Sequence, residues 1–508
     1  MHTQGTSSRC RRQRVKPGGV KAKTTELPWP SDTRRPVFGA RRVHVEADRR
    51  GRATPYGGLA LAHQLIQGLE LPQAIDHGVP VFKIYLPYHE SDHLLTHVYN
   101  LFAGGSCIED IASLQDSEAF RSLVGACRVP DPTTAGDFLR RFKAPTLGFL
   151  QQVFDDAHEK VWAALPRAKR RVATVDLDST IKPVRGECKE GADFSYTGKW
   201  SYHPLLISVA ETNECLRLIN RSGNRPSAEG SGEALDQCLG RLTRHFRKVR
   251  VRGDTAFGGQ ETVRVCDVYK NVEFAFGLNA TANLVQMAEN LSPRAFRPFQ
   301  SKVPAGGATA KSRARRRHRR RTRRLRARER GYRTLRTVRQ WVAEFRYRPG
   351  WADRDYRVVV RRQLVETSQG QEALFERYVY RFFLTDIEDM TPSEIVRFAY
   401  GRCAQENTIE QLKNGISAMA MPTGELVANA VFLMAGQLAW NLRAWLSLLA
   451  LPTESLHWEW KRFRHAFVYV AARVVHRARR VRVRISSSHR FADTFLAASR
   501  RLDSLVFR

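Results

Sequence analysis

Two aspartates, Asp176 and Asp178, stand two residues apart in a stretch of alternating apolar and polar residues. Such alternation predicts a β-strand over residues 171–180, on which side chains two apart point to the same face. Asp is unfavourable in strands and neighbouring carboxylates repel each other, whereas a hard divalent cation stabilises such a pair. The alternative is a solvated strand end that leads into a turn at Ser179 and Thr180. This stretch alone leaves both interpretations open.

A further acidic residue, Asp254, ends a second predicted strand over residues 247–254. Residues 227–246, which precede it, have the spacing of an amphipathic helix. A strand that follows a helical crossover is able to lie parallel beside an earlier strand. Residues 203–210 and 215–220 predict two more strands that form a meander with the first. The sequence therefore predicts a sheet on which two acidic strand ends lie side by side.

A third group of charged residues follows the start signal Thr391-Pro-Ser-Glu394, which is typical of a capping box. Residues 395–413 then predict a helix on which Arg402, Glu406 and Lys413 share one face. Taken alone, this is an amphipathic helix with a ladder of surface ion pairs. A catalytic interpretation depends on the other acidic residues.

The overall charge indicates a polyanionic partner. The chain of 508 residues carries 84 Lys and Arg against 50 Asp and Glu, a net charge of +34. An excess of this size favours nucleic acid over a membrane surface. The run 311–330 consists mostly of Arg, and we expect it to contact DNA.

Three features argue against other classes of protein. The eight cysteines are scattered without a CxxC pair, which disfavours a zinc ribbon or a disulfide framework and fits a reducing compartment. The N-terminus lacks an apolar signal core, so we expect a cytoplasmic protein. Polar residues, among them Asn441 and Arg443, interrupt the apolar segment 426–451. This segment is expected to be a buried core helix and not a membrane span.

The stretch His89-Glu-Ser-Asp-His93 matches the H-E-x-x-H pattern of zinc proteases. That chemistry needs both histidines on one face of a continuous helix. Pro87 lies just upstream, and Ser91 or Asp92 is the expected helix N-cap. The motif would then straddle a helix boundary, which disfavours a metalloprotease.

Composition and periodicity suggest six segments. These are a basic disordered tail (1–54), a helical N-terminal DNA-binding domain (55–168), a first part of a catalytic core (169–294), a basic β-rich insertion (295–388), a last part of the core (389–452) and a basic C-terminal region (453–508).

Several short motifs occur in a specific order. They are VDLDST at 175–180, YHPLL at 202–206, GN at 223–224, RGDTAF at 252–257, the R-x3-E-x6-K spacing at 402–413, ANA at 428–430 and AARVVH at 471–476. In this order they resemble the DDE-type insertion-sequence transposases, in particular the Tyr-Arg-Glu-Lys branch of the insertion-sequence 1380 type. The resemblance covers about residues 55 to 505.

The resemblance implies an α/β fold, with an RNase H-like mixed sheet flanked by helices, a helical N-terminal domain and a β-rich insertion. It also implies a catalytic triad of two aspartates and one glutamate. The motif assigns Asp178, Asp254 and Glu406, with Asp176 as the alternative first acid. Glu410 lies one turn further on, but only Glu406 keeps the family spacing. The three carboxylates would bind two Mg²⁺ or Mn²⁺ ions.

Three further residues are implied to bind DNA, namely Tyr400, Arg402 and Lys413. The family tyrosine normally stands three residues before the arginine, whereas Tyr400 stands two before Arg402. The implied activity is metal-dependent cleavage of the ends of an insertion sequence and their joining to target DNA. The implied partners are double-stranded DNA and a second copy of the chain. Two alternatives stay open, a degenerate transposase that only binds DNA and an RNase H-like nuclease without strand transfer.

Overall fold

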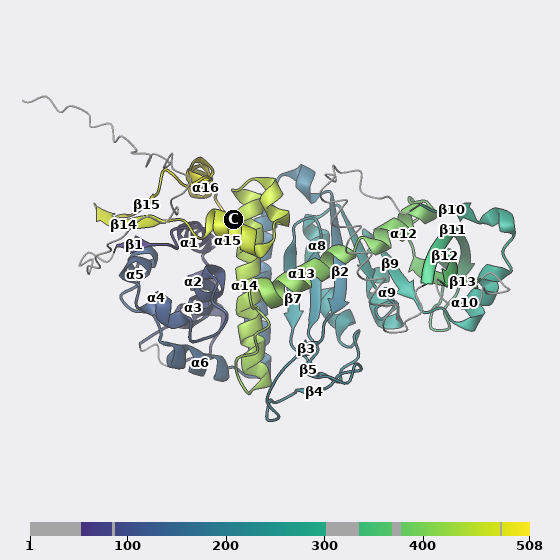
Figure 1. Cartoon of the computed structure of the whole chain (residues 1–508), viewed down its shortest axis with the longest axis horizontal. Helices are drawn as coiled ribbons and strands as arrows, with labels where there is room; N and C mark the ends of the chain where they lie inside the picture. Colours follow the sequence, from purple (N-terminus) through teal and green to yellow (C-terminus); the bar gives the residue numbers. More distant parts are fainter. Residues whose placement is uncertain (1–51, 84–86, 301–334, 368–376, 478–479, 508) are drawn as a thin grey trace, which may run out of the picture. The chain divides into compact units, whose positions relative to one another are not determined.

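The computed structural model describes residues 52–83, 87–300, 335–367, 377–477 and 480–507 (Figure 1). The described residues all belong to one compact unit, which is the subject of the following description. The arginine-rich run 311–330 and nearly all of the predicted basic tail lie outside the described residues.

A mixed sheet forms the centre of the fold. Its core strands are β2 (Val172–Ser179), β6 (Leu205–Val209), β7 (Glu214–Ile219), β8 (Lys248–Gly253) and β9 (Val272–Leu278). The hydrogen-bonded order is β9-β8-β2-β6-β7, with β2, β8 and β9 parallel and β6 and β7 antiparallel to their neighbours. This order confirms the predicted meander, the parallel pairing of the two acidic strands and the RNase H-like fold.

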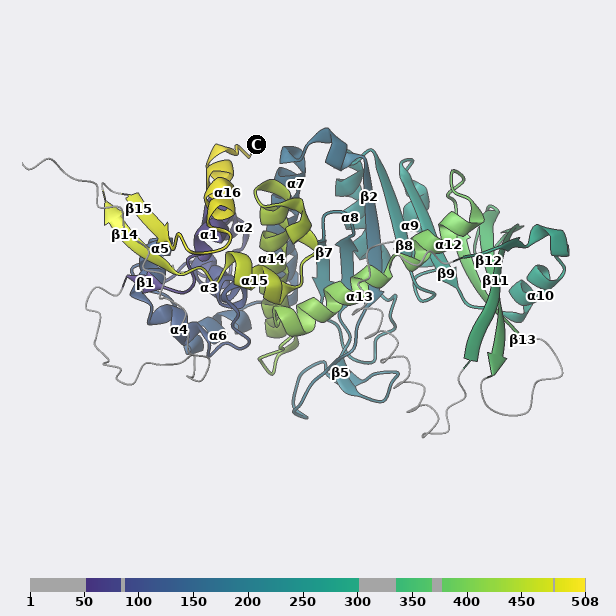
Figure 2. The same ribbon diagram turned by 45° about the horizontal axis from the view of Figure 1, so that its top comes forward.

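Helices cover both faces of this sheet. Helix α8 (Ser231–His245) is the crossover between β7 and β8, and α9 (Gln260–Val268) packs against β9. Helix α13 (Cys403–Glu410) crosses the opposite face, in front of the sheet in Figures 1 and 2. There the Gln405 side-chain amide donates to the Asp176 carbonyl at 2.8 Å. This contact fixes α13 directly over β2, the strand that carries the two aspartates.

The predicted β-rich insertion extends the same sheet. Its strands are β10 (Arg297–Pro298), β11 (Leu335–Tyr347), β12 (Tyr356–Thr367) and β13 (Arg377–Thr385), and α10 (Ala282–Glu289) precedes them. Strand β13 pairs antiparallel with β9, so the sheet has nine strands among the described residues. The chain returns from β13 through α12 (Pro392–Tyr400) to α13.

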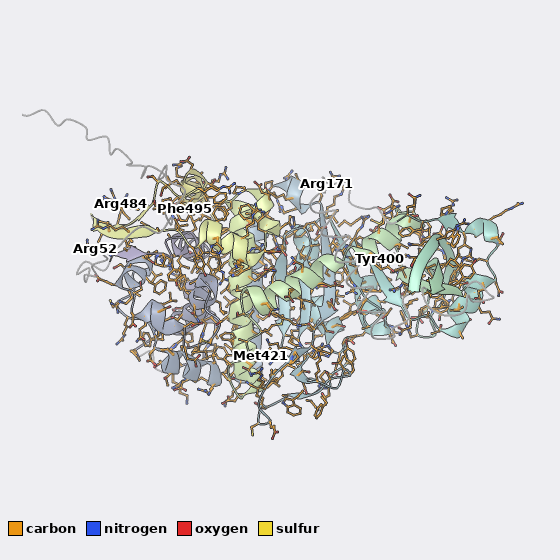
Figure 3. The ribbon with its side chains drawn as sticks, viewed as in Figure 1. Arg52, Arg171, Tyr400, Met421, Arg484 and Phe495 are labelled. Atoms are coloured by element: carbon orange, nitrogen blue, oxygen red, sulfur yellow. The ribbon has the colours of Figure 1, made fainter. Side chains whose placement is uncertain are left out.

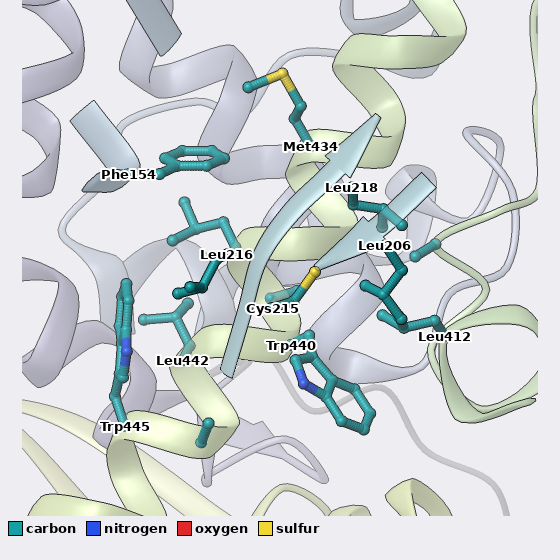
Figure 4. Packing of buried hydrophobic residues seen from close by; sticks show 14 of the residues in the cluster. Phe154, Leu206, Cys215, Leu216, Leu218, Leu412, Met434, Trp440, Leu442 and Trp445 are labelled. Carbon is teal, nitrogen blue, oxygen red and sulfur yellow. The ribbon is translucent and has the colours of Figure 1, made fainter. Parts of the chain in front are cut away.

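The apolar segment 426–451 is a buried helix, as expected. Helix α14 (Leu426–Leu449) packs against β7 and against α3, α6 and α7. Figure 4 shows Leu216 and Leu218 of β7 close to Met434 and Leu442 of the helix. Asn441 is satisfied by the backbone of β7, because its side-chain oxygen accepts from Cys215 N at 2.8 Å. Among the described helices, none has the length and apolarity needed to cross a membrane.

The region before β2 is helical. It contains α1 (Leu59–Gly68), α2 (Leu71–Gly78), α3 (Glu90–Ala103), α4 (Ile111–Gln115), α5 (Glu118–Val124), α6 (Pro132–Arg140), α7 (Ala144–Ala164) and the short η1 (Arg167–Arg170). Leu59, Leu61 and Leu65 are buried in the apolar core, as their spacing predicts. The proposed division of the chain into domains remains a prediction.

The H-E-x-x-H stretch lies at the start of α3. His89 is the N-cap, so the predicted N-cap at Ser91 or Asp92 was wrong by two or three residues. The Glu90 carboxylate accepts from the backbone N–H of Phe82 at 2.8 Å, and His93 stacks on Phe138 at 4.7 Å. Burial lowers the pKa of His93 to about 4. Glu90 and His93 therefore stabilise the start of α3 through a hydrogen bond and ring packing.

Two small sheets complete the fold. The first consists of β3 (Lys182–Pro183), β5 (Trp200–Tyr202) and β4 (Asp193–Phe194), which follow the acidic end of β2. The second joins the two ends of the described chain and consists of β1 (Ala53–Thr54), β14 (Ala472–Arg477) and β15 (Arg480–Ile485). The remaining helices are η2 (Pro293–Ala295), η4 (Thr453–His457), α15 (Trp460–Phe467) and α16 (Ala492–Ser504).

Candidate active site

The two aspartates of β2 have different surroundings although they share a face of the strand. Asp176 is 2% exposed, and both of its oxygens are bound by Arg252, with an Nη2–Oδ2 distance of 3.1 Å. Asp176 and Arg252 are register partners on the parallel strands β2 and β8. Burial raises the pKa of Asp176 and the guanidinium opposes this rise. The Asp176 carboxylate is thus fully occupied inside the protein.

Asp178 lies one step further along the strand, where β2 opens toward solvent. Its side chain is 14% exposed, and Arg402 Nη1 approaches its Oδ2 at 3.1 Å. The Ser179 backbone N–H donates to the other oxygen at 2.8 Å. The pKa of Asp178 is raised to about 6, mainly by burial, while Arg402 lowers it and the charges of Asp254 and Glu406 raise it. Asp178 is therefore in the electrostatic range of both other acids assigned by the motif.

Asp254 and Glu406 are the more open members of this group. Asp254 directly follows β8, and its side chain is 38% exposed. It accepts from Ala256 N at 2.9 Å, and Arg402 Nη2 lies 4.0 Å from its second oxygen. Glu406 is exposed in the first turn of α13. Arg402 consequently stands between Asp178 and Asp254, at the ends of the two parallel strands.

The predicted continuous helix over residues 395–413 was wrong. Helix α12 ends at Tyr400 and α13 begins at Cys403, with Gly401 between them. A Cβ atom at Gly401 would lie 2.2 Å from Arg252 Nη1, so a larger residue there would displace the guanidinium group that binds Asp176. The break makes Arg402 the N-cap residue of α13 and places its side chain over the strand ends.

Lys413 reaches the same strand end from a different local structure. It lies in the π-helical turn η3 (Gln411–Gly415) that follows α13. Its Nζ donates to the Ile181 carbonyl at 2.9 Å and to the Thr180 hydroxyl. Burial lowers the pKa of Lys413, and the nearby Lys182 lowers it further. The structure therefore brings Arg402 and Lys413 to the end of β2, although not along one regular helix.

Tyr400 occupies a different position from these two cations. Its ring packs against Phe383, with ring centroids 5.6 Å apart, and Arg361 lies over it at 5.0 Å. Its hydroxyl is buried without a hydrogen-bond partner among the described residues. A cavity of about 620 Å³ lies beside it, lined among others by Asp254, Tyr380, Tyr400, Arg402 and Glu406. Two of the three acids thus border a space large enough for part of a substrate.

The chemistry of this donor set fits a hard divalent cation. Asp178 and Asp254 lie at the ends of two strands and Glu406 lies on α13, and the charges of Asp254 and Glu406 contribute to the raised pKa of Asp178. Oxygen ligands of this kind suit Mg²⁺ or Mn²⁺. In the described part of the chain, no three or more His, Cys, Asp or Glu side chains stand close enough to hold a metal ion as they are. The Arg402 guanidinium lies between Asp178 and Asp254, at 3.1 Å and 4.0 Å from their oxygens.

Two residues that position this site were missed in the sequence. Arg252 fixes Asp176 and also donates to the Phe398 carbonyl at 2.9 Å, which joins β8 to α12. Gln405 is buried and bridges α13 to β2 and to Ser208 of β6. The sequence predicted that the strand of Arg252 lies parallel to that of Asp176, but the register that pairs these two residues comes from the structure. No comparable pattern indicated Gln405.

An RNase H-like α/β fold with acidic residues at the ends of adjacent parallel strands defines the class of this protein. The sequence matches the family described as transposase DDE domain group 1 over residues 36–507. The chain therefore belongs to this family of DDE transposases.

Two further comparisons add context. One similar solved structure is a cryo-EM structure of a piggyBac transposase synaptic complex with hairpin DNA. The TM-score is 0.33 at 10% sequence identity, covering 79% of this chain and 82% of that chain. No protein with a curated function matches the sequence.

Proposed function

We propose that the protein is an insertion-sequence transposase of the 1380 type, which cuts DNA at the ends of its element and joins those ends to target DNA. The observation that carries this proposal is that Arg402 lies between Asp178 and Asp254 at the ends of two parallel strands, beside a cavity that Asp254 and Glu406 line. Membership of the DDE transposase family supports the same conclusion.

Asp178, Asp254 and Glu406 would hold one or two divalent ions in this proposal, with Asp176 serving the fold. Bound there, the ions would supply Lewis acidity to the attacking and leaving oxygens of the phosphodiester. The Asp176 carboxylate is already shared with Arg252 in the interior, whereas Asp178 is partly open. This difference supports Asp178 as the first catalytic acid.

Arg402 and Lys413 would position the DNA backbone. Catalysis of phosphoryl transfer rests mainly on positioning and on charge stabilisation, which cations around a phosphate provide. Arg402 is 23% exposed and lies at the cavity wall, so it is able to exchange a carboxylate for a phosphate oxygen. Lys413 is already held by backbone and hydroxyl oxygens, which fixes its charge beside the strand end. Tyr400 would contribute mainly through packing, because its ring is held between Phe383 and Arg361.

One assay separates the proposed transposase from its two alternatives, a nuclease without strand transfer and a degenerate transposase that only binds DNA. Full-length protein, Mg²⁺, a labelled element end and a plasmid target are incubated together, with Asp254→Asn as the inactive control. Cleavage and joined product, both absent with Asp254→Asn, support the proposal. Cleavage without joining favours a nuclease on the same fold, and binding without cleavage favours a degenerate transposase. A homodimer that holds both element ends would show as paired-end complexes in the same reaction.

A further inference from the structure

The hairpin formed by β14 and β15 carries a row of arginines on one face. Cross-strand partners point to the same side of a sheet, and the register pairs Arg473 with Arg484, Val475 with Arg482 and Arg477 with Arg480. Arg473, Arg480, Arg482 and Arg484 are all exposed. We use the name arginine face for these four side chains. In Figure 3, Arg484 is labelled on this hairpin.

The opposite face of the hairpin accounts for its stability. Val474 is fully buried, and Val483 and Ile485 pack against the apolar core. Helix α5 contacts both β14 and β15 and contributes Phe120 and Leu123 to that core. The fold therefore anchors the hairpin through its apolar side. The arginine face has no part in this packing.

The arginine face has no internal partner. No hydrogen bond, ion pair or ring contact joins these four side chains to another described residue. Arg473 stands directly opposite Arg484, and like charges in this position destabilise a sheet. This repulsion lowers the stability of the free protein, and a bound polyanion would remove it by neutralising the arginines.

We infer that the arginine face binds the phosphate backbone of duplex DNA, at a site separate from the catalytic acids. None of its residues lines the cavity beside Asp254 and Glu406. A two-stranded β-ribbon matches the dimensions of a DNA groove, and guanidinium groups bind phosphate oxygens in a bidentate manner. The four guanidinium groups carry charge of a single sign with no acidic partner among the described residues, and a polyanion such as DNA complements such a surface. The choice of duplex DNA as the polyanion rests on the proposed function.

The test uses the full chain without divalent metal, so that binding is read independently of cleavage. The variant is Arg482→Gln with Arg484→Gln. The control is Arg244→Gln with Arg348→Gln, which removes the same charge from exposed arginines that already pair with Glu159 and Asp355. Binding of a duplex of arbitrary sequence is measured by fluorescence anisotropy over a series of salt concentrations.

We expect the variant to lose about tenfold or more in affinity, and its salt slope to fall by about 1.8, since each neutralised phosphate contributes about 0.9. The control pair should change both quantities much less. The melting temperature of the variant should be unchanged or higher, because a like-charge contact is removed. A purely structural role for these arginines would lower it.

Three results would overturn the inference. They are wild-type affinity and slope in the variant, an equal loss in the control pair, and binding to phosphatidylserine vesicles that depends on these arginines while DNA binding does not. A failure of the proposed function would give a different result. The wild-type protein would then not cleave the element end, but it would still bind duplex DNA through these arginines.

Discussion

The interior of β2 and its open end each hold an aspartate next to an arginine. The two pairs differ in their exposure to solvent and in their further partners. Asp176 and Arg252 are 2% and 9% exposed, and Arg252 binds both oxygens of the Asp176 carboxylate. Asp178 and Arg402 are 14% and 23% exposed, and Arg402 also approaches Asp254. A step of two residues along one strand thus separates a pair that serves the fold from a group that is free to exchange its partner for a ligand.

Replacing the open aspartate should have the largest effect on activity. We expect Asp178→Asn to reduce DNA cleavage by about 1,000-fold, equivalent to about 4 kcal/mol of transition-state stabilisation. Its melting temperature should be unchanged or higher, because burial already disfavours the charged carboxylate. Single-turnover cleavage kinetics and thermal unfolding measure the two effects. Asp137→Asn, in an exposed ion pair on α6, is the matched control and should cleave normally.

Breaking the buried pair should affect stability instead. Arg252→Met leaves the Asp176 carboxylate buried without its cation, which costs about 3–5 kcal/mol. The double variant Asp176→Leu with Arg252→Met should recover most of this loss, since apolar residues of similar size often replace a buried pair at little cost. Urea unfolding reports the free energy of unfolding for each variant. Additive losses in the double variant would contradict the pairing.

Replacing Arg402 should lower the cleavage rate and hardly change stability, with effects smaller than those expected for Asp178. Because Arg402 is partly exposed, Arg402→Gln should change the free energy of unfolding by less than about 1 kcal/mol. Loss of phosphate positioning should slow cleavage by about 10- to 100-fold, or about 1.4–2.7 kcal/mol. Arg402→Lys should recover part of the rate, because it keeps the charge but not the planar fork. A large loss of stability with normal cleavage would show that Arg402 belongs with the buried pair.

A third carboxylate, Asp386, shows what a largely buried aspartate does without an arginine. It accepts from Phe274 N at 2.7 Å and has no ion pair with a described residue, and burial raises its pKa to about 6. A raised pKa means that its contribution to stability is present at acidic pH and is lost as the pH rises through the folded-state value. Asp386→Asn should therefore stabilise the protein by about 1–2 kcal/mol at pH 8 and have little effect at pH 4. Urea unfolding at both pH values tests this, and an equal effect at both would contradict it.

The sequence predicted the parts of this arrangement that follow from local periodicity. Alternation located β2, and the intervening helix predicted that β8 would lie parallel beside it. The break at Gly401 was not predicted, because the helical pattern continues through it and the close approach of Arg252 to Gly401 comes from a distant strand. Lys413, in the π-helical turn, is likewise held by Thr180 and Ile181, which directly follow β2. Partners distant in the sequence therefore decide how the charged residues of the site are oriented.

The most direct test is Mn²⁺ binding measured by electron paramagnetic resonance in the wild type, Asp178→Asn and Asp137→Asn. Mn²⁺ suits oxygen ligands and reports binding without any DNA substrate. We predict at least about a tenfold loss of affinity in Asp178→Asn, equivalent to about 1.4 kcal/mol, and none in Asp137→Asn. Wild-type Mn²⁺ affinity in Asp178→Asn would contradict the assignment of Asp178 as a metal ligand.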